Sequence, residues 1–385
     1  MRYVINPFRE AGPFPMPSRS AVRGFHRSLP GYSPTPLVRL TGLAKSLGVG
    51  DFYLKYEGAR FGLSAFKALG GSWALHRLLA SRPGTFTTVS TASEGNHGRA
   101  VAWAARLMKI PCVIFLPAHA AAERIANIEH EGATVMLVDG TYEDAVRRCD
   151  RESGERGWQI ISDVGYEGYL EIPPLVVEGY STIFGEIDEQ LAAEGWPSPD
   201  LVLIPGGVGG ILQAGVDHYR GLADPPAIVG VEPQAADCLT TSLGSPGGAP
   251  AISQGDRATT LACLNCAEVS WPSWPSIRRG VDAMMAIDDE AAERAVEGRR
   301  IVRVEAVVGE NGLHGGRQRR AGDAAGEPVP QAPVGAVAPG DGVGGEGGIG
   351  PRVPGVDVHA VEIDHAAVVD GGLGVGARDV VVVLR

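Results

Sequence analysis

The chain has 385 residues, of which 44% are hydrophobic and 21% are charged, and its formal net charge at pH 7 is -11. This length allows two or three domains with buried cores. The hydrophobic fraction is typical of a globular protein. The negative charge disfavours general binding to nucleic acids or to anionic membrane surfaces, and no stretch approaches the apolar length of a membrane span.

The amino-terminal stretch MRYVINPFREAGPFP has no continuous apolar core, so we expect no secretory signal. The five cysteines are odd in number and loosely spaced, which is typical of reduced thiols in a cytoplasm rather than of a disulfide framework. Cys263 and Cys266 form one CxxC pair without a second pair or a nearby set of histidines. We therefore interpret them as buried or loop thiols and expect no metal site.

From about residue 52 to residue 300, short β-branched runs alternate with helical stretches. The predicted strands, in chain order, are 52–56, 86–90, 112–116, 134–138, 201–205 and 227–231. Helix-like segments lie between them, such as 98–108, in which apolar residues recur at helical spacing. Continuous apolar strands separated by helices indicate parallel sheets covered on both faces, so the predicted fold class is α/β.

Residues 301–385 differ in composition from the rest of the chain. They contain no Phe, Trp or Tyr, although the first 300 residues hold all twenty-four, and they contain three Leu against nineteen Gly. Such a stretch buries too little apolar area to offset the entropy of ordering it. We expect irregular coil there, except at 378–385, where RDVVVVLR is able to pair as a strand. One hypothesis for this composition is a shifted reading frame in a GC-rich gene, which sequencing of the source DNA would test.

The stretch SAFKALGG at 64–71 places a lysine among apolar neighbours. Lys67 is one of four lysines in a chain that holds thirty arginines. An arginine stays charged in proteins, whereas a partly desolvated lysine can lose its proton and act as a nucleophilic amine. Schiff-base chemistry requires such an amine. The alternative interpretation is a surface lysine on an amphipathic helix.

The strongest predicted anion site is LVLIPGGVGGILQAG at 201–215, where an apolar strand runs into four glycines before a helix opens. Backbone N–H groups in such a loop can point at a phosphate, and the helix amino terminus adds partial positive charge. A cofactor with one phosphate needs only this glycine cluster. A dinucleotide site needs G-x-G-x-x-G, and Leu212 stands at the third position, although Glu232 could serve as the ribose-binding acid. A nicotinamide oxidoreductase and a purely structural turn stay open as alternatives.

Two further loops follow predicted strands, at the edge where open α/β sheets bind ligands. The first is TASEGNHGRAVAW at 91–103, whose exposed amides can hold a carboxylate and whose Asn96 can donate to an oxyanion on a cofactor ring. Helix capping is the alternative for its polar residues. The second is ISDVGYEGYLEIP at 161–173, where Asp163 is either a partly desolvated general base or an ordinary turn residue.

In this order, the motifs resemble those of the tryptophan synthase β-like group of pyridoxal phosphate (PLP) enzymes, called fold type II, and within it the diaminopropionate ammonia-lyase family. The resemblance covers roughly residues 30–300 and is carried by 35–49, 52–75, 91–103, 161–173, 205–210, 227–233 and 260–275. It implies two open parallel-sheet domains with the cofactor in the cleft between them. The implied boundaries are 1–85 and 196–304 for the large domain, 86–195 for the small domain, and 305–385 for the atypical tail.

The resemblance also implies roles for individual residues. Lys67 would form the Schiff base with pyridoxal 5'-phosphate, and Asn96 would bind the phenolic oxygen of the cofactor. The expected phosphate cradle is Gly206, Gly207, Val208, Gly209 and Gly210, and the expected substrate-carboxylate pocket is Ser93, Gly95 and His97. Asp163 would take the α-proton from one substrate enantiomer. We expect Ser64 to cap the helix that contains Lys67, whose dipole would favour the neutral amine.

The chain departs from the family at two places. Glu94 stands where the family has an aspartate that serves the opposite enantiomer. One extra methylene moves the carboxylate by about a bond length, and a displacement of about 1 Å can cost ~100-fold in rate. After 287–298 the family continues with helices and a strand that supply a hydroxyl near the pyridine nitrogen, a pattern that this chain loses after 307–316.

The reaction implied by the resemblance is α,β-elimination from 2,3-diaminopropionate to give pyruvate and ammonia, as a step of amino-acid catabolism. We expect a cytoplasmic homodimer that acts on a small amino acid and binds neither nucleic acid nor membrane. A serine or threonine dehydratase, which uses the same scaffold, is the alternative. A catalytically impaired relic of the family is a further alternative, suggested by residues 305–385.

Overall fold

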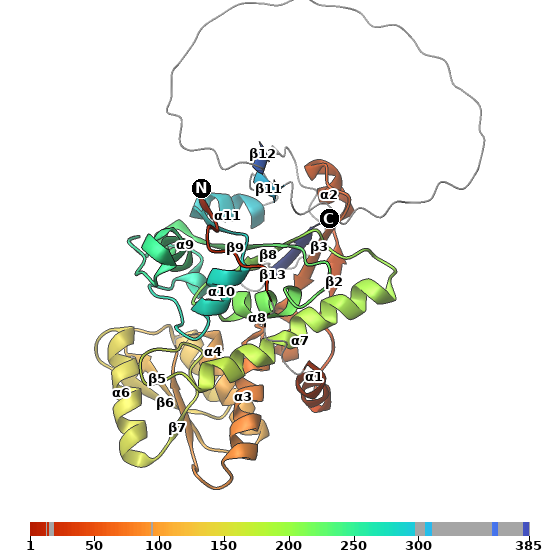
Figure 1. The fold of residues 1–385 in the computed structure, drawn as a ribbon. Helices are drawn as coiled ribbons and strands as arrows, with labels where there is room; N and C mark the ends of the chain where they lie inside the picture. Colours follow the sequence, from red (N-terminus) through yellow and green to blue (C-terminus); the bar gives the residue numbers. More distant parts are fainter. Residues whose placement is uncertain are drawn as a thin grey trace, which may run out of the picture. The chain divides into compact units, whose positions relative to one another are not determined.

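A computed structural model of the chain describes residues 1–12, 14, 19–93, 95–296, 305–309, 356–360 and 380–384. The chain divides into two compact units, one of Met1–Arg303 with Glu362–Arg385 and one of Val304–Val361. In the second unit, β11 (Glu305–Gly309) and β12 (Val356–Ala360) pair antiparallel. The first unit contains two sheets (Figure 1).

The larger sheet has seven strands in the order β1-β10-β9-β8-β13-β3-β2. Their bounds are Arg2–Ile5 (β1), Leu37–Arg39 (β2), Phe52–Tyr56 (β3), Leu201–Pro205 (β8), Ala227–Pro233 (β9), Ala283–Ile287 (β10) and Val380–Leu384 (β13). β8, β9 and β10 are parallel, and β13 is antiparallel to both β8 and β3. The carboxyl ends of β3 and β8 therefore lie at the same edge of the sheet, where ligands bind in α/β folds.

The smaller sheet has four parallel strands in the order β6-β5-β4-β7. Their bounds are Val89–Ala92 (β4), Cys112–Pro117 (β5), Thr134–Val138 (β6) and Gln159–Ile160 (β7). The burial of all six residues of β5 reflects its central position and its apolar sequence. β4 and β7 lie side by side and are parallel, so the loop that leads from β4 to Asn96 and the loop after β7 that contains Asp163 leave the same edge of the sheet.

Eleven α-helices occur among the described residues. They are Arg19–Ser28 (α1), Thr41–Leu47 (α2), Lys67–Ser81 (α3), Asn96–Leu107 (α4), Ala122–His130 (α5), Tyr142–Arg156 (α6), Ile172–Ala193 (α7), Gly210–Tyr219 (α8), Cys238–Gly244 (α9), Trp274–Gly280 (α10) and Asp289–Val296 (α11). Four short 3-10 helices are Glu57–Gly62 (η1), Gln234–Ala236 (η2), Pro246–Gly248 (η3) and Ala262–Leu264 (η4). Figure 1 shows α6 on one face of the four-stranded sheet and α3 and α4 on the other, while α7 packs against α3 and α8.

The α/β class predicted from the sequence is confirmed, and three predicted strands (52–56, 134–138 and 201–205) match β3, β6 and β8 residue for residue. The strand predicted at 86–90 is shifted, because Phe86 is buried in the core but pairing begins only at Val89. The larger sheet is mixed rather than wholly parallel, since β1, β2 and β13 run antiparallel to their neighbours. Both sheets lie in the first unit, and the boundaries of the two proposed domains stay a prediction.

The expectation for residues 301–385 is met at one place and wrong at two. β13 confirms the strand expected within 378–385. Residues 305–309 and 356–360, expected to be irregular, form β11 and β12, whose valine content favours extended backbone. The remaining residues of 305–385, with the frame-shift hypothesis that concerns them, lie outside the described residues.

A cluster of buried charges lies where β3 passes into η1. The side chains of Lys55, Glu57, Arg60 and Glu186 are all 0% exposed. Lys55 Nζ donates to Glu186 Oε2 at 2.8 Å, and Arg60 donates to Glu57 and to Glu186 at 2.7 to 2.9 Å. Two cations therefore face two carboxylates, which ties the strand that leads toward Lys67 to helix α7.

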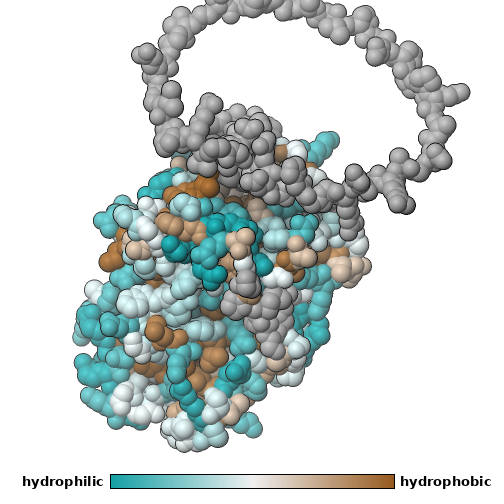
Figure 2. Space-filling model, viewed as in Figure 1, coloured by the Kyte–Doolittle hydropathy of each residue, from teal (hydrophilic) through white to brown (hydrophobic). Residues whose placement is uncertain are grey.

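The surface view in Figure 2 shows hydrophobic residues in separate patches among hydrophilic ones. Large apolar side chains that are about half exposed include Leu137, Leu170, Ile252 and Trp271. Scattered exposure of this kind is normal for a folded protein. Among the helices of the described segments, none combines the length and the apolar content that crossing a membrane requires.

Candidate active site

Lys67 is the first residue of helix α3, at the carboxyl edge of the larger sheet. The chain reaches it from β3 through η1, and on this path two residues other than glycine have left-handed backbone conformations, Phe61 (φ 51°) and Ser64 (φ 58°). The expectation that Ser64 caps this helix is wrong, because the N-cap is Phe66 and no side chain caps α3. The left-handed turn at Ser64 carries the chain into the helix in place of a cap.

The lysine amine faces a carboxylate from the smaller sheet. Lys67 Nζ donates to Asp163 Oδ2 at 2.6 Å, and the two side chains are 24% and 15% exposed. Asp163 lies in the loop after β7, as the sequence predicts. The rings of Phe66 and Tyr180 flank the amine, with centroids 5.3 Å and 5.7 Å from Nζ. The two residues that the sequence separates by 96 positions thus form one partly open pair.

Because of this pairing, the lysine is charged, whereas the sequence predicts a neutral amine. Burial lowers the pKa of Lys67, but the charges of Asp163 and Tyr180 raise it, and the net shift is upward. Burial likewise raises the pKa of Asp163, but His97 and Lys67 lower it, and the net shift is downward. The expectation of a neutral amine is therefore wrong for the lysine beside Asp163, which is an ammonium group paired with a carboxylate.

His97 lies behind Asp163 on the first turn of α4. Its Nε2 is 2.9 Å from the carbonyl oxygen of Ile161, which can only accept, so Nε2 carries the proton. Its Nδ1 lies 3.8 Å from Asp163 Oδ2. Burial lowers the pKa of His97, which favours the neutral ring. The bond to Ile161 fixes this ring next to the carboxylate of Asp163.

The glycine loop lies between β8 and α8. Gly207 and Gly209 have φ angles of 60° and 104°, in the left-handed region that favours glycine. A Cβ at Gly209 would lie 2.6 Å from Ile277 Cδ1. The first N–H groups of α8 have no partner within the helix, and the helix dipole adds partial positive charge there. The loop is therefore built for close approach of an anion to the backbone.

Contacts through shared neighbours bring the lysine and the glycine loop together. The ring of Tyr180 lies next to Lys67 and 3.5 Å from the position of a Cβ at Gly210. Cys266 Sγ lies 3.8 Å from the position of a Cβ at Gly207, and its thiol interacts with the charge of Lys67. The amine and the loop thus line one site, in which Cys266 and Tyr180 lie between them.

Asn96 joins the same site from the smaller sheet. It is the first residue of α4, and its Nδ2 lies 3.7 Å from Cys263 Sγ. The carbonyl oxygen of Cys263 is 4.0 Å from the position of a Cβ at Gly207. The segment that contains Cys263 and Cys266 therefore contacts both Asn96 and the glycine loop.

The turn before α4 contains the residues predicted to bind the substrate carboxylate. Gly95 N donates to Ser93 Oγ at 3.4 Å, which fixes the turn, and His97 follows one residue after Asn96. A Cβ at Gly98 would lie 2.9 Å from the carbonyl oxygen of Ser93. The structure thus brings Ser93, Gly95 and His97 to the edge that holds Asp163. Glu94, the second predicted acid, lies outside the described residues.

Several residues that line the site are not predicted as site residues from the sequence. Phe66 and Tyr180 flank the amine, Cys266 lies beside the glycine loop, and Ser270 hydrogen-bonds both Gly165 and Val208. Phe66 adjoins Lys67, and the sequence identifies it only as one of the apolar neighbours of the lysine. The other three reach the site only through tertiary packing, because Tyr180 is a core position of a long helix and Cys266 and Ser270 lie in an irregular segment.

The position of Glu232 corrects one alternative interpretation. Glu232, the candidate ribose-binding acid, is fully buried and accepts from the N–H groups of Leu239 and Thr240. Burial raises the pKa of Glu232 to about 8. Its carboxyl is bonded to the first turn of α9 and is not available to a nucleotide. Cys263 is exposed and Cys266 is partly buried. Within the described residues, no group of three or more ligating side chains is placed to hold a metal ion.

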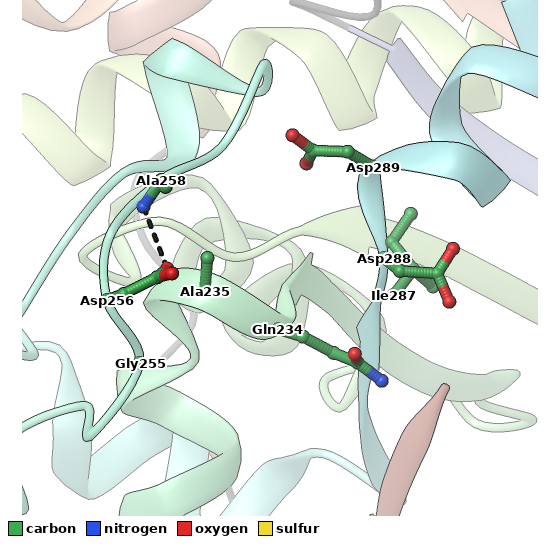
Figure 3. A pocket seen from close by; sticks show the side chains of 8 residues that line it. All are labelled: Gln234, Ala235, Gly255, Asp256, Ala258, Ile287, Asp288 and Asp289. Carbon is green, nitrogen blue, oxygen red and sulfur yellow. Dashed lines mark hydrogen bonds between the residues drawn. The ribbon is translucent and has the colours of Figure 1, made fainter.

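A hollow away from Lys67 lies at the carboxyl ends of β9 and β10, with a volume of about 360 Å³ (Figure 3). Its carboxylates serve the local fold. Asp256 accepts from the N–H of Ala258, Asp288 accepts from Ala291, and Asp289 accepts from Thr259 and Thr260. None of the residues lining it belongs to the Lys67 site. This hollow is therefore separate from the residues around Lys67.

Comparisons with known proteins agree with this geometry. The family model described as "Pyridoxal-phosphate dependent enzyme" matches residues 29–310. Diaminopropionate ammonia-lyase of Salmonella typhimurium is 36% identical over 297 residues, which cover 71% of this chain and 74% of that protein. The enzyme of the same name from Escherichia coli K12 is 34% identical over 288 residues, which cover 70% and 72% of the two chains.

Solved structures show the same likeness. The crystal structure of holo diaminopropionate ammonia-lyase from Escherichia coli has a TM-score of 0.70 at 31% identity, covering 77% of this chain and 79% of that one. A structure of that enzyme in complex with an aminoacrylate-PLP azomethine reaction intermediate has a TM-score of 0.69 at 33% identity, with the same coverage.

The residues present fit pyridoxal phosphate. The site offers one accessible amine, and beside it a glycine loop in which an added Cβ at Gly209 would collide with Ile277. A backbone loop with open N–H groups suits a single phosphate. On the family match and the identities with these relatives, the chain belongs to the pyridoxal-phosphate-dependent enzymes, in the diaminopropionate ammonia-lyase family.

Proposed function

We propose that the chain catalyses the α,β-elimination of 2,3-diaminopropionate, which with one water yields pyruvate and two molecules of ammonia. The observation that carries this proposal is the pair of Lys67 and Asp163 at 2.6 Å, beside a glycine loop joined to it through Tyr180 and Cys266. An amine, an acid–base group and an anion cradle are the parts that a PLP-dependent elimination needs.

Pyridoxal phosphate, when bound, supplies an electron sink that stabilises negative charge at the substrate Cα. Lys67 is the residue that would hold it covalently, since its amine reaches the open side of the site. Gly206, Gly207, Val208, Gly209 and Gly210 would hold the phosphate with their backbone, and Asn96 would donate to the ring hydroxyl oxygen. These assignments use groups from both sheets.

Asp163 is the base that takes the α-proton from the substrate. Its lowered pKa keeps it a carboxylate at neutral pH, so it is ready to accept. It lies 2.6 Å from Lys67 Nζ. The substrate amine would take the place of this amine on the cofactor, so the substrate Cα would lie close to Asp163. The β-amino group leaves as ammonia after protonation, and the ammonium of Lys67 is a proton donor within reach.

The turn at 93–97 binds the substrate carboxylate. Ser93, Gly95 and His97 would line this pocket, because they precede or begin α4, whose amino-terminal N–H groups favour an anion. A carboxylate held there keeps the substrate Cα on the side of Asp163. The enantiomer whose α-proton faces Asp163 should be consumed about 100-fold faster than the other, if Glu94 serves the other with a displaced carboxylate.

The test uses PLP-loaded protein with each enantiomer of 2,3-diaminopropionate and, in parallel, with serine and threonine. Pyruvate and ammonia are measured together. The expected result is two ammonia molecules per pyruvate from diaminopropionate, with slower turnover of serine. Faster turnover of serine or threonine would assign a dehydratase instead, and no pyruvate from any of them would contradict an active lyase.

We also propose that the protein works in the cytoplasm as a homodimer. None of its five cysteines, all of them in the described residues, takes part in a disulfide there, which supports a reducing compartment. Light scattering on the purified holoprotein tests the dimer, because the mass of one chain is 40.2 kDa and a dimer has twice that mass. A mass of a single chain would contradict it.

A further inference from the structure

The irregular segment between η4 and α10 contains a serine that contacts both sides of the site. Ser270 is 0% exposed. Its backbone N–H donates to the carbonyl oxygen of Val208 at 2.8 Å, inside the glycine loop. Its hydroxyl oxygen accepts from the backbone N–H of Gly165 at 2.9 Å, in the loop of Asp163. One residue therefore bonds the proposed phosphate loop and the loop of the proposed base.

The contact with Gly165 is reinforced by the next two residues. Trp271 N donates to the carbonyl oxygen of Gly165 at 3.0 Å. Pro272 packs so closely on Gly165 that a Cβ there would overlap the proline ring. Gly165 lies two residues after Asp163, so these contacts fix the backbone that presents the carboxylate.

The other end of the bridge is also fixed. The carbonyl oxygen of Ser270 accepts from Ser273 N at 3.0 Å and from Trp274 N at 3.2 Å, at the start of α10. The serine is therefore part of a helix start rather than of a mobile loop end. Ser270, held at the start of α10, therefore sets the distance between the Asp163 loop and the glycine loop.

We propose that Ser270 is a positioning residue for the elimination, which holds the Asp163 carboxylate at a fixed distance from the cofactor phosphate site. This inference rests on the proposed function, because it assumes that Asp163 takes the α-proton. The backbone bond to Val208 does not depend on the side chain. Loss of the hydroxyl therefore removes one of the contacts that hold the Asp163 loop, while the contacts of Trp271 and Pro272 with Gly165 remain and the glycine loop stays in place.

The test compares Ser270→Ala with Ser181→Ala in the full chain. Ser181 is a buried serine of α7, 2% exposed, whose hydroxyl has no hydrogen-bond partner among the described residues. We expect Ser270→Ala to lower kcat about 100-fold, the cost of a displacement of about 1 Å. The PLP dissociation constant of Ser270→Ala should change by less than about threefold, since the backbone bond to the glycine loop remains. Ser181→Ala should change neither kcat nor the PLP dissociation constant.

A readout on the proton transfer separates positioning from general damage. With α-deuterated diaminopropionate, Ser270→Ala should show a larger isotope effect on kcat than the parent chain, because abstraction becomes slower. Equal kinetics for the two alanine variants, or a parallel loss of PLP affinity and kcat in Ser270→Ala, would overturn the proposal.

Hydrogen exchange tests the bridge without any turnover. In Ser270→Ala, amides of the loop 161–171 should exchange faster than in the parent chain, while those of 205–215 stay unchanged. Unchanged exchange in 161–171 would overturn the bridge even if the parent chain is an active lyase. Absence of pyruvate from the parent chain would instead overturn the proposed function, so the two failures are distinct.

A second pair of variants covers the case in which Ser270→Ala does not fold. Ser270→Thr keeps the hydroxyl and Ser270→Val replaces it with a methyl group of similar size. The threonine variant should retain at least about ten times the kcat of the valine variant, since only threonine can accept from Gly165 N. Equal kcat values in this pair would contradict the proposal.

Discussion

Lys55 and Lys67 are both paired with a carboxylate, but their surroundings differ. The side chain of Lys55 is 0% exposed, and its ammonium donates to three acceptors, namely the carbonyl oxygen of Thr35, Glu186 and Gln190, at 2.7 to 2.8 Å. Lys67 is 24% exposed and donates to a single carboxylate, with aromatic rings on its flanks. The first ammonium is saturated with partners, and the second is open to a ligand.

The difference teaches that a low pKa is not what marks the reactive lysine here. Burial lowers the pKa of Lys55, whereas the pKa of Lys67 is raised by Asp163 against the effect of burial. A search for the most desolvated lysine would select Lys55, which has no free donor and no accessible side. Both lysines have a carboxylate partner, and solvent access to the amine distinguishes Lys67.

The largest effect that we predict is the loss of kcat when Asp163, the partner of Lys67, is replaced. Asp163→Asn keeps the shape of the side chain and removes the base, so kcat should fall about 10³-fold, within the range for general bases. Steady-state kinetics with diaminopropionate measures this, and the PLP dissociation constant is the control, which should change little. A loss below about tenfold would show that another group takes the α-proton.

Removing Lys55 from the buried cluster of Lys55, Glu57, Arg60 and Glu186 should lower the free energy of unfolding and leave kcat nearly unchanged. Lys55→Met leaves Glu186 and Glu57 buried with Arg60 alone, and removal of one partner from a buried ionic cluster costs about 3–5 kcal/mol. Urea unfolding of the variant and the parent chain measures the difference. The kcat of the folded fraction should stay within about threefold of the parent. A 100-fold loss of kcat with unchanged stability would remove the distinction between the two lysines.

The glycine loop provides a smaller, more local test. Gly209→Ala places a Cβ at a φ of 104° and 2.6 Å from Ile277 Cδ1, so the backbone is strained and either the Ile277 side chain or the loop must shift. A strained residue of this kind costs about 1–3 kcal/mol, and we expect PLP affinity to fall about tenfold. Gly247→Ala is the matched control, with a φ of 67° and no atom within 4 Å of the new Cβ. Equal PLP affinity in both variants would contradict the proposal that the loop 206–210 binds the cofactor phosphate.

The smallest predicted effect is the pH dependence of the Lys67–Asp163 pair in cofactor-free protein. The pKa of Asp163 is lower in the folded chain than its ordinary value of about 4. Its stabilisation is therefore present above about pH 4 and is lost as the pH falls through the folded pKa. The difference in unfolding free energy between the parent and Asp163→Asn should shrink from pH 5 to pH 3. A difference that grows over this range would reverse the assigned shift.

Sequence reasoning located the site where local pattern and chemistry coincide. Strands such as 134–138 are short apolar runs bounded by turns, and Lys67, Asp163 and the glycine loop each follow a predicted strand. The predicted strand ends place Lys67 and the glycine loop on the larger sheet and Asp163 on the smaller one, and in the structure the lysine meets the aspartate across the two sheets. The start of β4 at Val89 was missed because Phe86 is buried without being paired.

The rest depends on tertiary contacts that no local pattern encodes. Tyr180 reads as one of many apolar positions of α7, and its contact with Lys67 exists only because α7 packs on α3. Ser270 lies in an irregular segment whose two bonds reach residues 62 and 105 positions away. The sequence predicts a neutral Lys67 because the partner that raises its pKa, Asp163, is distant in sequence.

The central claim is that Lys67, and not Lys55, is the amine that holds the cofactor. The direct measurement is mass spectrometry of the PLP-loaded chain after borohydride reduction and trypsin digestion, with Lys67→Ala as the control. We predict the reduced pyridoxyl group on the peptide 61–77, and no such group anywhere in Lys67→Ala. Modification of Lys55, or of any other residue in the parent chain with Lys67 unmodified, would contradict the claim.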